Sequence, residues 1–174
     1  MRMKDVDFKI LAGLMKNSKI SDRKLADLIG VSQPTITRRR ARLEAELSLD
    51  YTVIPDFSKL GIEIMAFHFS NWKAEEYDSL SRTSDFQKRI AEFIKGQNNM
   101  ILISSGQGCG QSRVGVSFHR DYSEYVAYRA KVQEEWGAHL ANYESFIISL
   151  KSDRILRPLT LKYLADYIQN GRST

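Results

Sequence analysis

The segment from Ser32 to Glu44 contains the side chains with the clearest chemistry in the chain. It reads Ser-Gln-Pro-Thr-Ile-Thr-Arg-Arg-Arg-Ala-Arg-Leu-Glu. A helix with Ile36 and Leu43 turned inward leaves polar and basic side chains on its open faces, namely Ser32, Gln33, Thr35, Thr37, Arg38, Arg39 and Arg42. Such a helix fits the major groove of double-stranded DNA, where Gln pairs with adenine and Arg with guanine, and Thr contacts phosphate or a thymine methyl group. The pattern therefore predicts a DNA-binding helix.

Charge is distributed unevenly along the chain. Residues 1–60 contain 12 Lys or Arg and 8 Asp or Glu, a net charge of +4, whereas residues 61–174 contain 14 and 13, a net charge of +1. A basic excess in one region is expected of a surface that neutralises phosphates, although a basic face exposed only to solvent has the same count. Charge alone leaves both interpretations open.

Three helices are predicted around this segment. The first spans Asp5–Met15, where apolar residues recur every four positions. Ser21 caps a second helix that ends at Gly30. Ser32 begins the third, with Pro34 tolerated in its first turn because amide hydrogens there lack helical partners. The turn between the second and third helices is too short for antiparallel packing, so they must cross steeply, as in a helix-turn-helix domain.

The remainder of the chain predicts a sheet with two helices. The elements, in order, are a strand, a helix, two strands around a glycine-rich turn, a long helix and a last strand: Ile62–Ser70, Asp85–Lys95, Met100–Ser105, Arg113–His119, the segment from Asp121 to Leu140, and Phe146–Leu150. Asp121 and Glu124 form a capping box, and the long helix has an apolar stripe of Tyr125, Tyr128, Val132, Trp136 and Leu140. This β-α-β-β-α-β order is typical of a ferredoxin-like fold.

These elements divide the chain into four parts. Residues 1–48 are the helix-turn-helix domain, and residues 49–61 are a linker that we interpret as a strand because it is β-branched and aromatic. Residues 62–150 are the ferredoxin-like domain. Residues 151–174 are a tail with a short amphipathic helix, and we expect the tail to strengthen self-association.

The N-terminal part resembles the Lrp/AsnC family of feast/famine transcriptional regulators. The resemblance rests on Asp7-Phe-Lys-Ile-Leu11, Ile20-Ser21, Leu25-Ala26, Gly30-Val-Ser32, Thr35-Ile36, Arg38-Arg39, Arg42-Leu43-Glu44, Tyr51-Thr52 and Lys59-Leu60-Gly61. It implies the α+β class, with an N-terminal (winged) helix-turn-helix, a C-terminal ligand-sensing and dimerisation domain, and a homodimer or larger homo-oligomer. Two residues depart from the family pattern: Arg40 stands where an aliphatic residue is usual, and Lys24 where an acid is.

The glycine-rich segment Gly106–Gly110 lies between two predicted strands. A dinucleotide-binding fingerprint requires a helix to begin there, so we reject a nucleotide site and predict a hairpin loop. The resemblance implies that this loop lines an effector pocket, for an amino acid or another small molecule, near Gly106, Gly108 and Ser112. Cys109 has no evident activating partner, so a redox role is disfavoured.

Other functional classes are disfavoured by composition. The longest apolar stretch, Ile62–Phe69, is far shorter than the roughly 20 residues of a membrane span, and the N-terminus lacks the pattern of a signal peptide. A cytoplasmic protein is expected. The single cysteine cannot form an internal disulfide, and His68, His119 and His139 do not have the spacing of a metal motif. We predict no metal, no cofactor and no catalytic residues.

Three functions follow from these patterns. The leading one is a sequence-specific transcriptional regulator that is not an enzyme. The second is an enzyme similar to the siroheme decarboxylases, which resemble the same two-domain plan. The third is an architectural protein that wraps DNA with little sequence preference, and only the ratio of specific to non-specific binding separates it from the first.

Overall fold

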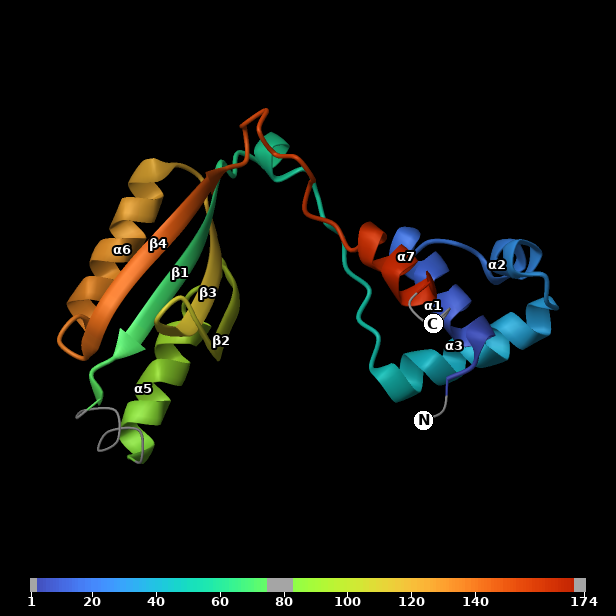
Figure 1. Cartoon of the computed structure of the whole chain (residues 1–174), viewed down its shortest axis with the longest axis horizontal. Coiled ribbons are helices and arrows are strands. Elements are labelled where there is room, and N and C mark those ends of the chain that lie inside the picture. The colour runs from blue at the N-terminus through green and yellow to red at the C-terminus, as the bar shows by residue number, and fades with distance from the viewer. Residues whose placement is uncertain (1–2, 75–82, 171–174) are drawn as a thin grey trace. The chain divides into compact units, whose positions relative to one another are not determined.

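The computed structural model describes residues 3–74 and 83–170, which form two compact units. Unit 1 combines residues 1–54 with residues 157–174, and unit 2 comprises residues 55–156. Figure 1 shows helices without strands in the first unit and a sheet with helices in the second.

Unit 1 contains the predicted tri-helical domain. Its helices are α1 (Asp5–Lys16), α2 (Asp22–Ile29) and α3 (Gln33–Leu47). The Lys24 amide donates to Ser21 Oγ at the start of α2, and Gly30 ends that helix at φ 80°, a conformation that favours glycine. The core is apolar and is formed by Ile10, Leu14, Ile20, Leu25, Ala26, Ile36 and Leu43. Residues 3–54 contain no strand, so these helices have no β-hairpin wing within that range.

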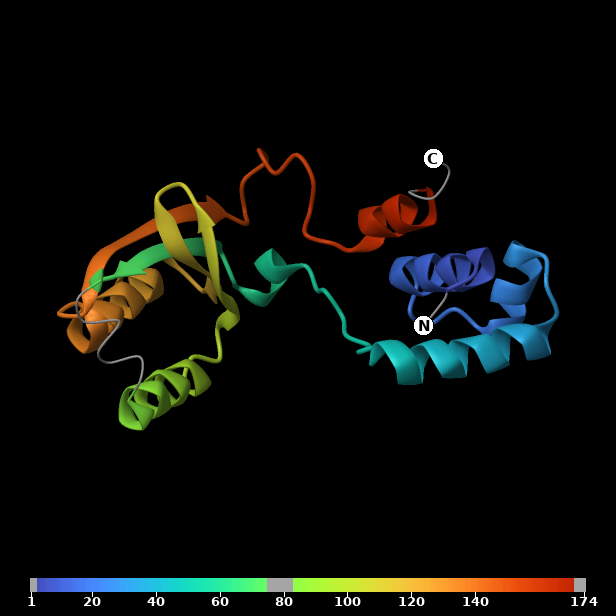
Figure 2. The same ribbon diagram turned by 60° about the horizontal axis from the view of Figure 1, so that its bottom comes forward.

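A fourth helix, α7 (Lys162–Asn170), completes unit 1 from the other end of the sequence. It packs against α1, as Figure 2 shows. Ala12 of α1 and Ala165 of α7 are both fully buried, and Lys16 forms an ion pair with Asp166. The tail therefore contains the predicted helix, and that helix belongs to the same unit as the helix-turn-helix.

Unit 2 is a four-stranded antiparallel sheet in the order β2-β3-β1-β4. Its elements, in chain order, are β1 (Ile64–Trp72), α5 (Ser84–Lys95), β2 (Met100–Gly108), β3 (Gln111–His119), α6 (Tyr122–Trp136) and β4 (Leu140–Ser149). Both helices cover the same face of the sheet (Figures 1 and 2). The ferredoxin-like βαββαβ fold predicted from the sequence is confirmed.

Two predictions about secondary structure were wrong. The predicted linker strand is not a strand: residues 49–56 have no regular structure, and a single 3-10 turn, η1 (Phe57–Leu60), follows. The β-branched residues there have no partner strand to pair with among the described residues. Leu140 does not extend the stripe of α6, because that helix ends at Gly137 and Leu140 instead begins β4 opposite Trp72.

The two faces of the sheet differ in composition. On the open face, one apolar row runs across all four strands, formed by Leu102, Val116, Phe67 and Phe146 in directly paired positions. Leu102 and Phe146 are 49% and 63% exposed. On the face under the helices, a polar row crosses three strands, because Ser70 pairs with Arg113 on one side and with Tyr143 on the other. The usual arrangement of a polar open face and an apolar covered face is therefore partly reversed.

Candidate nucleic-acid interface

Helix α3 is attached to α1 through a buried carboxylate. Asp7 is completely buried, and its two oxygens accept hydrogen bonds from Arg39 Nη1 and Arg42 Nη2, each at 2.9 Å. Its Oδ2 also accepts the Lys4 backbone amide at 2.8 Å. Charge-assisted bonds of this kind fix both distance and orientation, so the pair of arginines sets how α3 lies on α1.

The surroundings of Asp7 keep it ionised. Burial raises the pKa of the Asp7 carboxyl, but the hydrogen bond from the Lys4 amide and the charges of Arg39 and Arg42 outweigh it, and the pKa is lowered overall. The side chain of Arg39 is only 18% exposed. Arg39 therefore belongs to the internal structure of the domain.

Arg40, the departure from the family pattern, joins α3 to the start of α2. Its Nε donates to Glu44 at 2.9 Å, and its Nη1 donates to Asp22 at 3.1 Å and to the Ile20 carbonyl at 3.3 Å. Tyr51 Oη donates to the same Glu44 carboxylate at 2.5 Å. The hydrogen bond to Glu44 is the main cause of a raised Arg40 pKa. The stem of Arg40 thus lies near the core while its head is held by acids.

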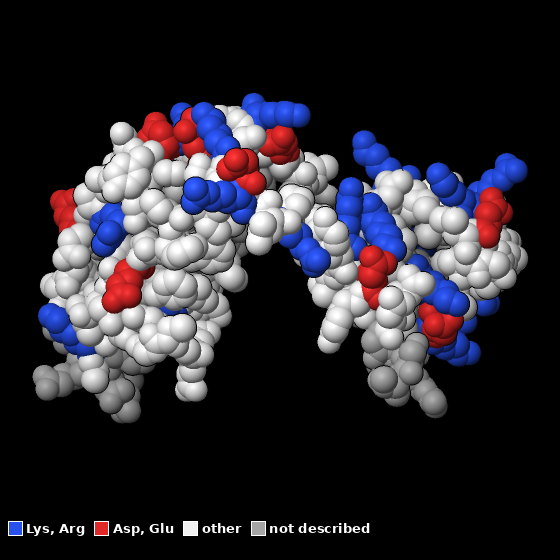
Figure 3. All heavy atoms as spheres, turned by 45° about the horizontal axis from the view of Figure 1, so that its top comes forward, with Lys and Arg blue, Asp and Glu red and all other residues white. Residues whose placement is uncertain are grey.

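The outward face of α3 carries the side chains that remain available to a ligand. Arg38 and Gln33 are exposed, and Arg38 forms no ion pair with any part of the chain that the structure describes. Ser32 and Thr35 are linked through their hydroxyls at 2.9 Å, and Thr37 donates to Asp22 Oδ2 at 2.7 Å. Figure 3 shows Lys and Arg side chains on both units, several of them on unit 1 at the right of the view.

The structure thus divides the predicted DNA-binding residues into two groups. One group lies along the first turns and the outer side of α3 and consists of Ser32, Gln33, Thr35, Thr37 and Arg38. Arg39 and, in part, Arg42 turn toward Asp7. The sequence analysis did not predict a role for Asp7 in positioning this helix. The signal was present, because Asp7 is spaced three and seven residues from the buried Ile10 and Leu14 and so lies on the inner face of α1.

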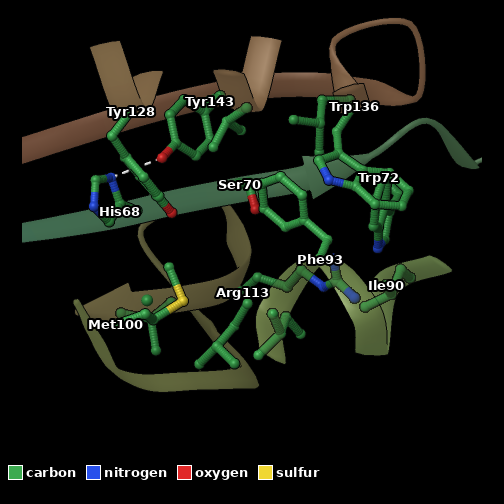
Figure 4. Close-up of a pocket in the computed structure, with 16 residues that line it drawn as sticks. His68, Ser70, Trp72, Ile90, Phe93, Met100, Arg113, Tyr128, Trp136 and Tyr143 are labelled. Carbon is green, nitrogen blue, oxygen red and sulfur yellow. Dashed lines mark hydrogen bonds between the residues drawn. The ribbon is translucent and has the colours of Figure 1, made fainter. Parts of the chain in front are cut away.

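The residues predicted for an effector lie at the tip of the β2–β3 hairpin. Gly106 and Gly108 are exposed, and a Cβ at either position would meet no atom within 4 Å beyond the glycine and its two chain neighbours. The tip turns through Cys109 and Gly110, at φ 51° and 71°. Asn71 of β1 holds it from the side, accepting the Ser112 amide and donating to the Gly110 carbonyl, both at 2.7 Å. These residues form the tip of the hairpin, and none of them lines the cavity between the sheet and the helices α5 and α6 (Figure 4).

A second polar site lies under the helices of unit 2. His68 is 4% exposed, and its ring nitrogens contact Ser117 Oγ at 2.6 Å and Tyr143 Oη at 2.8 Å. Ser117 Oγ continues the chain to His119 Nε2 at 2.8 Å. Burial is the main cause that lowers the pKa of His68 to about 4, and burial lowers the pKa of His119 as well. His68 is therefore a neutral, hydrogen-bonded core residue at neutral pH.

Neither unit offers a metal centre or a membrane span within its described residues. No group of three or more His, Cys, Asp or Glu side chains there is arranged to hold a metal ion. No helix in residues 3–74 or 83–170 is long and apolar enough to cross a membrane.

Comparison with known sequences points to one family. The family model of the AsnC-type helix-turn-helix domain matches residues 3–44. The leucine-responsive regulatory protein of Rhizobium meliloti (strain 1021) is 29% identical over 103 residues, which cover 56% of this chain. The alignment covers 66% of that relative, slightly less than two thirds of its length.

Solved structures share the fold of the whole chain. A transcriptional regulator of Neisseria meningitidis, solved as a complex with L-Met, has a TM-score of 0.72 at 15% identity, covering 94% of this chain and 99% of that one. An AsnC family transcriptional regulator from Agrobacterium tumefaciens has a TM-score of 0.70 at 17% identity, with coverages of 93% and 99%. AsnC of E. coli has a TM-score of 0.65 at 17% identity, with coverages of 91% and 99%. At these identities the likeness concerns the fold alone.

The helix-turn-helix geometry and the family match together define an AsnC-type helix-turn-helix domain at the N-terminal end of the described chain. The chain is similar to the Lrp/AsnC regulators in that domain and in its fold, and the resemblance predicted from its sequence is confirmed.

Proposed function

We propose that the protein regulates transcription by binding specific sequences of double-stranded DNA with the outward face of α3. The observation that carries this proposal is the contrast between neighbouring arginines. Arg39 is paired with the buried Asp7, whereas Arg38 is exposed. A guanidinium held away from other charges on a rigid helix is suited to a guanine edge or a phosphate.

We assign different roles to the residues proposed to contact DNA. Gln33 and Arg38 are the base-reading candidates, because both are long and exposed. Ser32 and Thr35 are short hydroxyl side chains suited to phosphate oxygens near the helix N-terminus. Thr37 can donate to a phosphate only by giving up its hydrogen bond to Asp22. Arg39 orients the helix, and Arg42, 39% exposed, has room for a phosphate contact in addition to its bond with Asp7.

The working form is proposed to be a homodimer or a larger homo-oligomer. The support is the apolar row on the open face of the sheet, whose central members are Phe67 and Val116 and whose outer members are exposed. An apolar row of this kind is suited to a second copy of itself across a two-fold axis. A dimer presents two recognition helices to half-sites about one helical turn of DNA apart, or a multiple of that distance.

Self-association is tested by placing a charge on that row. Phe146→Lys should convert the protein to a monomer in sedimentation velocity, because an unpaired lysine is costly to bury. Tyr122→Lys, an exposed aromatic on α6, is the matched control and should leave the oligomer intact. An unchanged oligomer in the Phe146 variant would refute the sheet interface.

A small effector is proposed to bind near Gly106, Gly108 and Ser112 at the sensor-domain interface. The support is the position of these residues at the hairpin tip, where Asn71 bonds to Gly110 and Ser112. The Neisseria meningitidis regulator solved with L-Met supports an amino acid as the ligand class. The experiment is a titration of amino acids into the protein–DNA complex, with Ser112→Ala as the variant expected to weaken the response.

The main experiment is a titration of the purified protein with DNA from its own promoter region and with scrambled DNA, at two salt concentrations. The proposal predicts preference for the promoter fragment and affinity that falls steeply with salt. Equal binding to both fragments would favour the architectural alternative. We also propose that the protein is not an enzyme. Absence of binding to either DNA fragment would favour the enzyme alternative instead.

A further inference from the structure

An acidic side chain lies between the second and third helices of the helix-turn-helix domain. Asp22 is the first residue of α2, and its two oxygens accept hydrogen bonds from two residues of α3. Oδ2 accepts the Thr37 hydroxyl at 2.7 Å, and Oδ1 accepts Arg40 Nη1 at 3.1 Å. Asp22 and Thr37 are 15 positions apart in the sequence, so the crossing of the two helices creates this contact.

Thr37 belongs to the side of α3 that is proposed to face DNA. It is exposed and lies about one helical turn after Gln33, and residues at this spacing share one side of a helix. Threonine hydroxyls bind phosphate oxygens in protein–DNA complexes, but each hydroxyl has a single hydrogen to donate. A phosphate that accepts the Thr37 hydrogen bond therefore has to displace the Asp22 carboxylate.

The same carboxylate also offsets positive charge on α3. Arg40 is held by two acids, Asp22 at 3.1 Å and Glu44 at 2.9 Å. Tyr51 Oη donates to the same Glu44 carboxylate and adds no charge. Two carboxylates around one guanidinium leave a negative charge in excess, and like charges repel. This cluster therefore opposes the approach of a DNA phosphate.

A purely structural role for Asp22 predicts a different result from competition with phosphate. If the carboxylate only stabilises the crossing of α2 and α3, its loss weakens DNA binding or leaves it unchanged. If it competes with phosphate, its loss strengthens DNA binding, because the Thr37 hydroxyl and one donor of Arg40 are freed. The sign of the change in DNA affinity therefore distinguishes the two roles.

We propose that Asp22 is a positioning residue that limits DNA affinity: its carboxylate holds the Thr37 hydroxyl and the Arg40 guanidinium, and it competes with a DNA phosphate for both. This role rests on the proposed function, since it concerns the way the outward face of α3 meets DNA. It adds an inhibitory residue from α2 to the contacts proposed for α3. It applies to DNA of any sequence, because phosphate contacts carry no direct sequence information.

The experiment repeats the DNA titration with Asp22→Ala, which removes the charge and both acceptor oxygens. We expect affinity to rise at least about threefold for the promoter fragment and the scrambled fragment alike. The slope of log affinity against log salt concentration should become steeper by about one unit, as expected for one further phosphate contact. Affinity that is unchanged or lower in a folded Asp22→Ala protein would overturn the proposal.

Asp27→Ala is the matched control for the loss of one negative charge. Asp27 lies on the same helix and is exposed, and it pairs with no charged side chain in residues 3–74 or 83–170. Because solvent and salt screen an exposed charge, this variant should raise DNA affinity less than about twofold. An equal rise in both variants would show that net charge sets the affinity, and it would overturn the proposal.

A double variant tests the contact with Thr37 directly. When Thr37→Val is added to Asp22→Ala, the freed hydroxyl is removed, and at least about half of the gain in affinity should disappear. A gain that is fully retained would contradict competition for Thr37. If Asp22→Ala does not fold, Asp22→Ser removes the same charge with a residue that suits the start of a helix, and the same rise in affinity is expected.

The wild-type protein separates this role from the proposed function. Absence of DNA binding by the wild type would refute both. Preference of the wild type for the promoter fragment, with no gain in affinity in a folded Asp22→Ala or Asp22→Ser protein, would refute only the role of Asp22.

Discussion

The two units of the protein bury polar groups in different ways. Unit 1 buries a charge: the Asp7 carboxylate is shielded from water and paired with two guanidinium groups. Unit 2 buries a chain of uncharged groups, in which His68 and Ser117 share a 2.6 Å hydrogen bond. The charged cluster holds a helix in one orientation, whereas the neutral chain lies beside a cavity.

This difference follows from the energy of desolvation. A buried ion pair recovers its desolvation cost only in one geometry, so it resists displacement but is expensive to break. A neutral hydrogen-bonded chain costs less to bury and can exchange partners. The first arrangement suits a helix held in one fixed orientation, and the second suits an interior whose hydrogen bonds can be rearranged at low cost.

The largest expected effect comes from removing the buried carboxylate. Asp7→Ala leaves Arg39 and Arg42 without a counter-charge at the base of α3, and unit 1 should lose about 3–5 kcal/mol of unfolding free energy. Urea denaturation followed by circular dichroism measures this loss. Asp5→Ala is the control, because Asp5 is 71% exposed and its pair with Lys9 should contribute less than about 1 kcal/mol. Equal stabilities of the two variants would contradict the anchoring role of Asp7.

The second largest expected effect is a loss of unfolding free energy in unit 2 when the pH is lowered. The lowered pKa keeps His68 neutral in the folded state down to pH about 4, whereas the unfolded chain takes up a proton near the ordinary histidine pKa of 6.5. Unfolding is therefore favoured as the pH falls from about 6.5 to about 4. The loss of unfolding free energy that comes from His68 approaches about 3 kcal/mol. His119 adds a change of the same sign.

Variants at histidine isolate this dependence. His68→Gln should lower stability at neutral pH and flatten its decline between pH 6.5 and 4, as measured by urea denaturation at several pH values. The wild-type protein, measured under the same conditions, is the reference for this slope. An unaltered slope in His68→Gln would mean that His68 does not titrate as the geometry requires.

A smaller effect is expected where α7 meets α1. Ala165 is fully buried against that helix, so Ala165→Leu should overpack the contact and cost unit 1 about 1–3 kcal/mol. Tyr167→Leu, at a position 74% exposed on the same helix, should change stability by less than about 0.5 kcal/mol. Thermal unfolding of both variants gives the comparison, and a neutral Ala165→Leu would argue that α7 does not pack tightly.

Sequence reasoning succeeded where a local pattern decides the structure. The helix-turn-helix followed from apolar spacing and from the caps at Ser21 and Gly30, and the β-α-β-β-α-β order followed from alternation and turn residues. Prediction failed where contacts with residues distant in the sequence determine the secondary structure. The β-branched linker has no partner strand among the described residues, and Leu140 continues a helical spacing but pairs with Trp72 in the sheet.

The candidate site was predicted in outline and not in detail. Exposure of Arg38 could be read from the helical wheel, but the attachment of Arg39 depends on Asp7, which lies 32 residues earlier in the chain. The cavity could not be predicted either, since Arg113, Ser70 and Tyr143 come together only through the register of three strands. Sequence spacing contains no information on such long-range pairs.

The most direct test of the account compares the neighbouring arginines Arg38 and Arg39 in one DNA titration. We expect Arg38→Ala to keep wild-type stability and oligomeric state while its affinity for promoter DNA falls about 10- to 100-fold. Arg39→Ala should instead lower the unfolding free energy of unit 1. Wild-type DNA affinity in a folded Arg38→Ala protein would contradict the central claim that the outward face of α3 reads DNA.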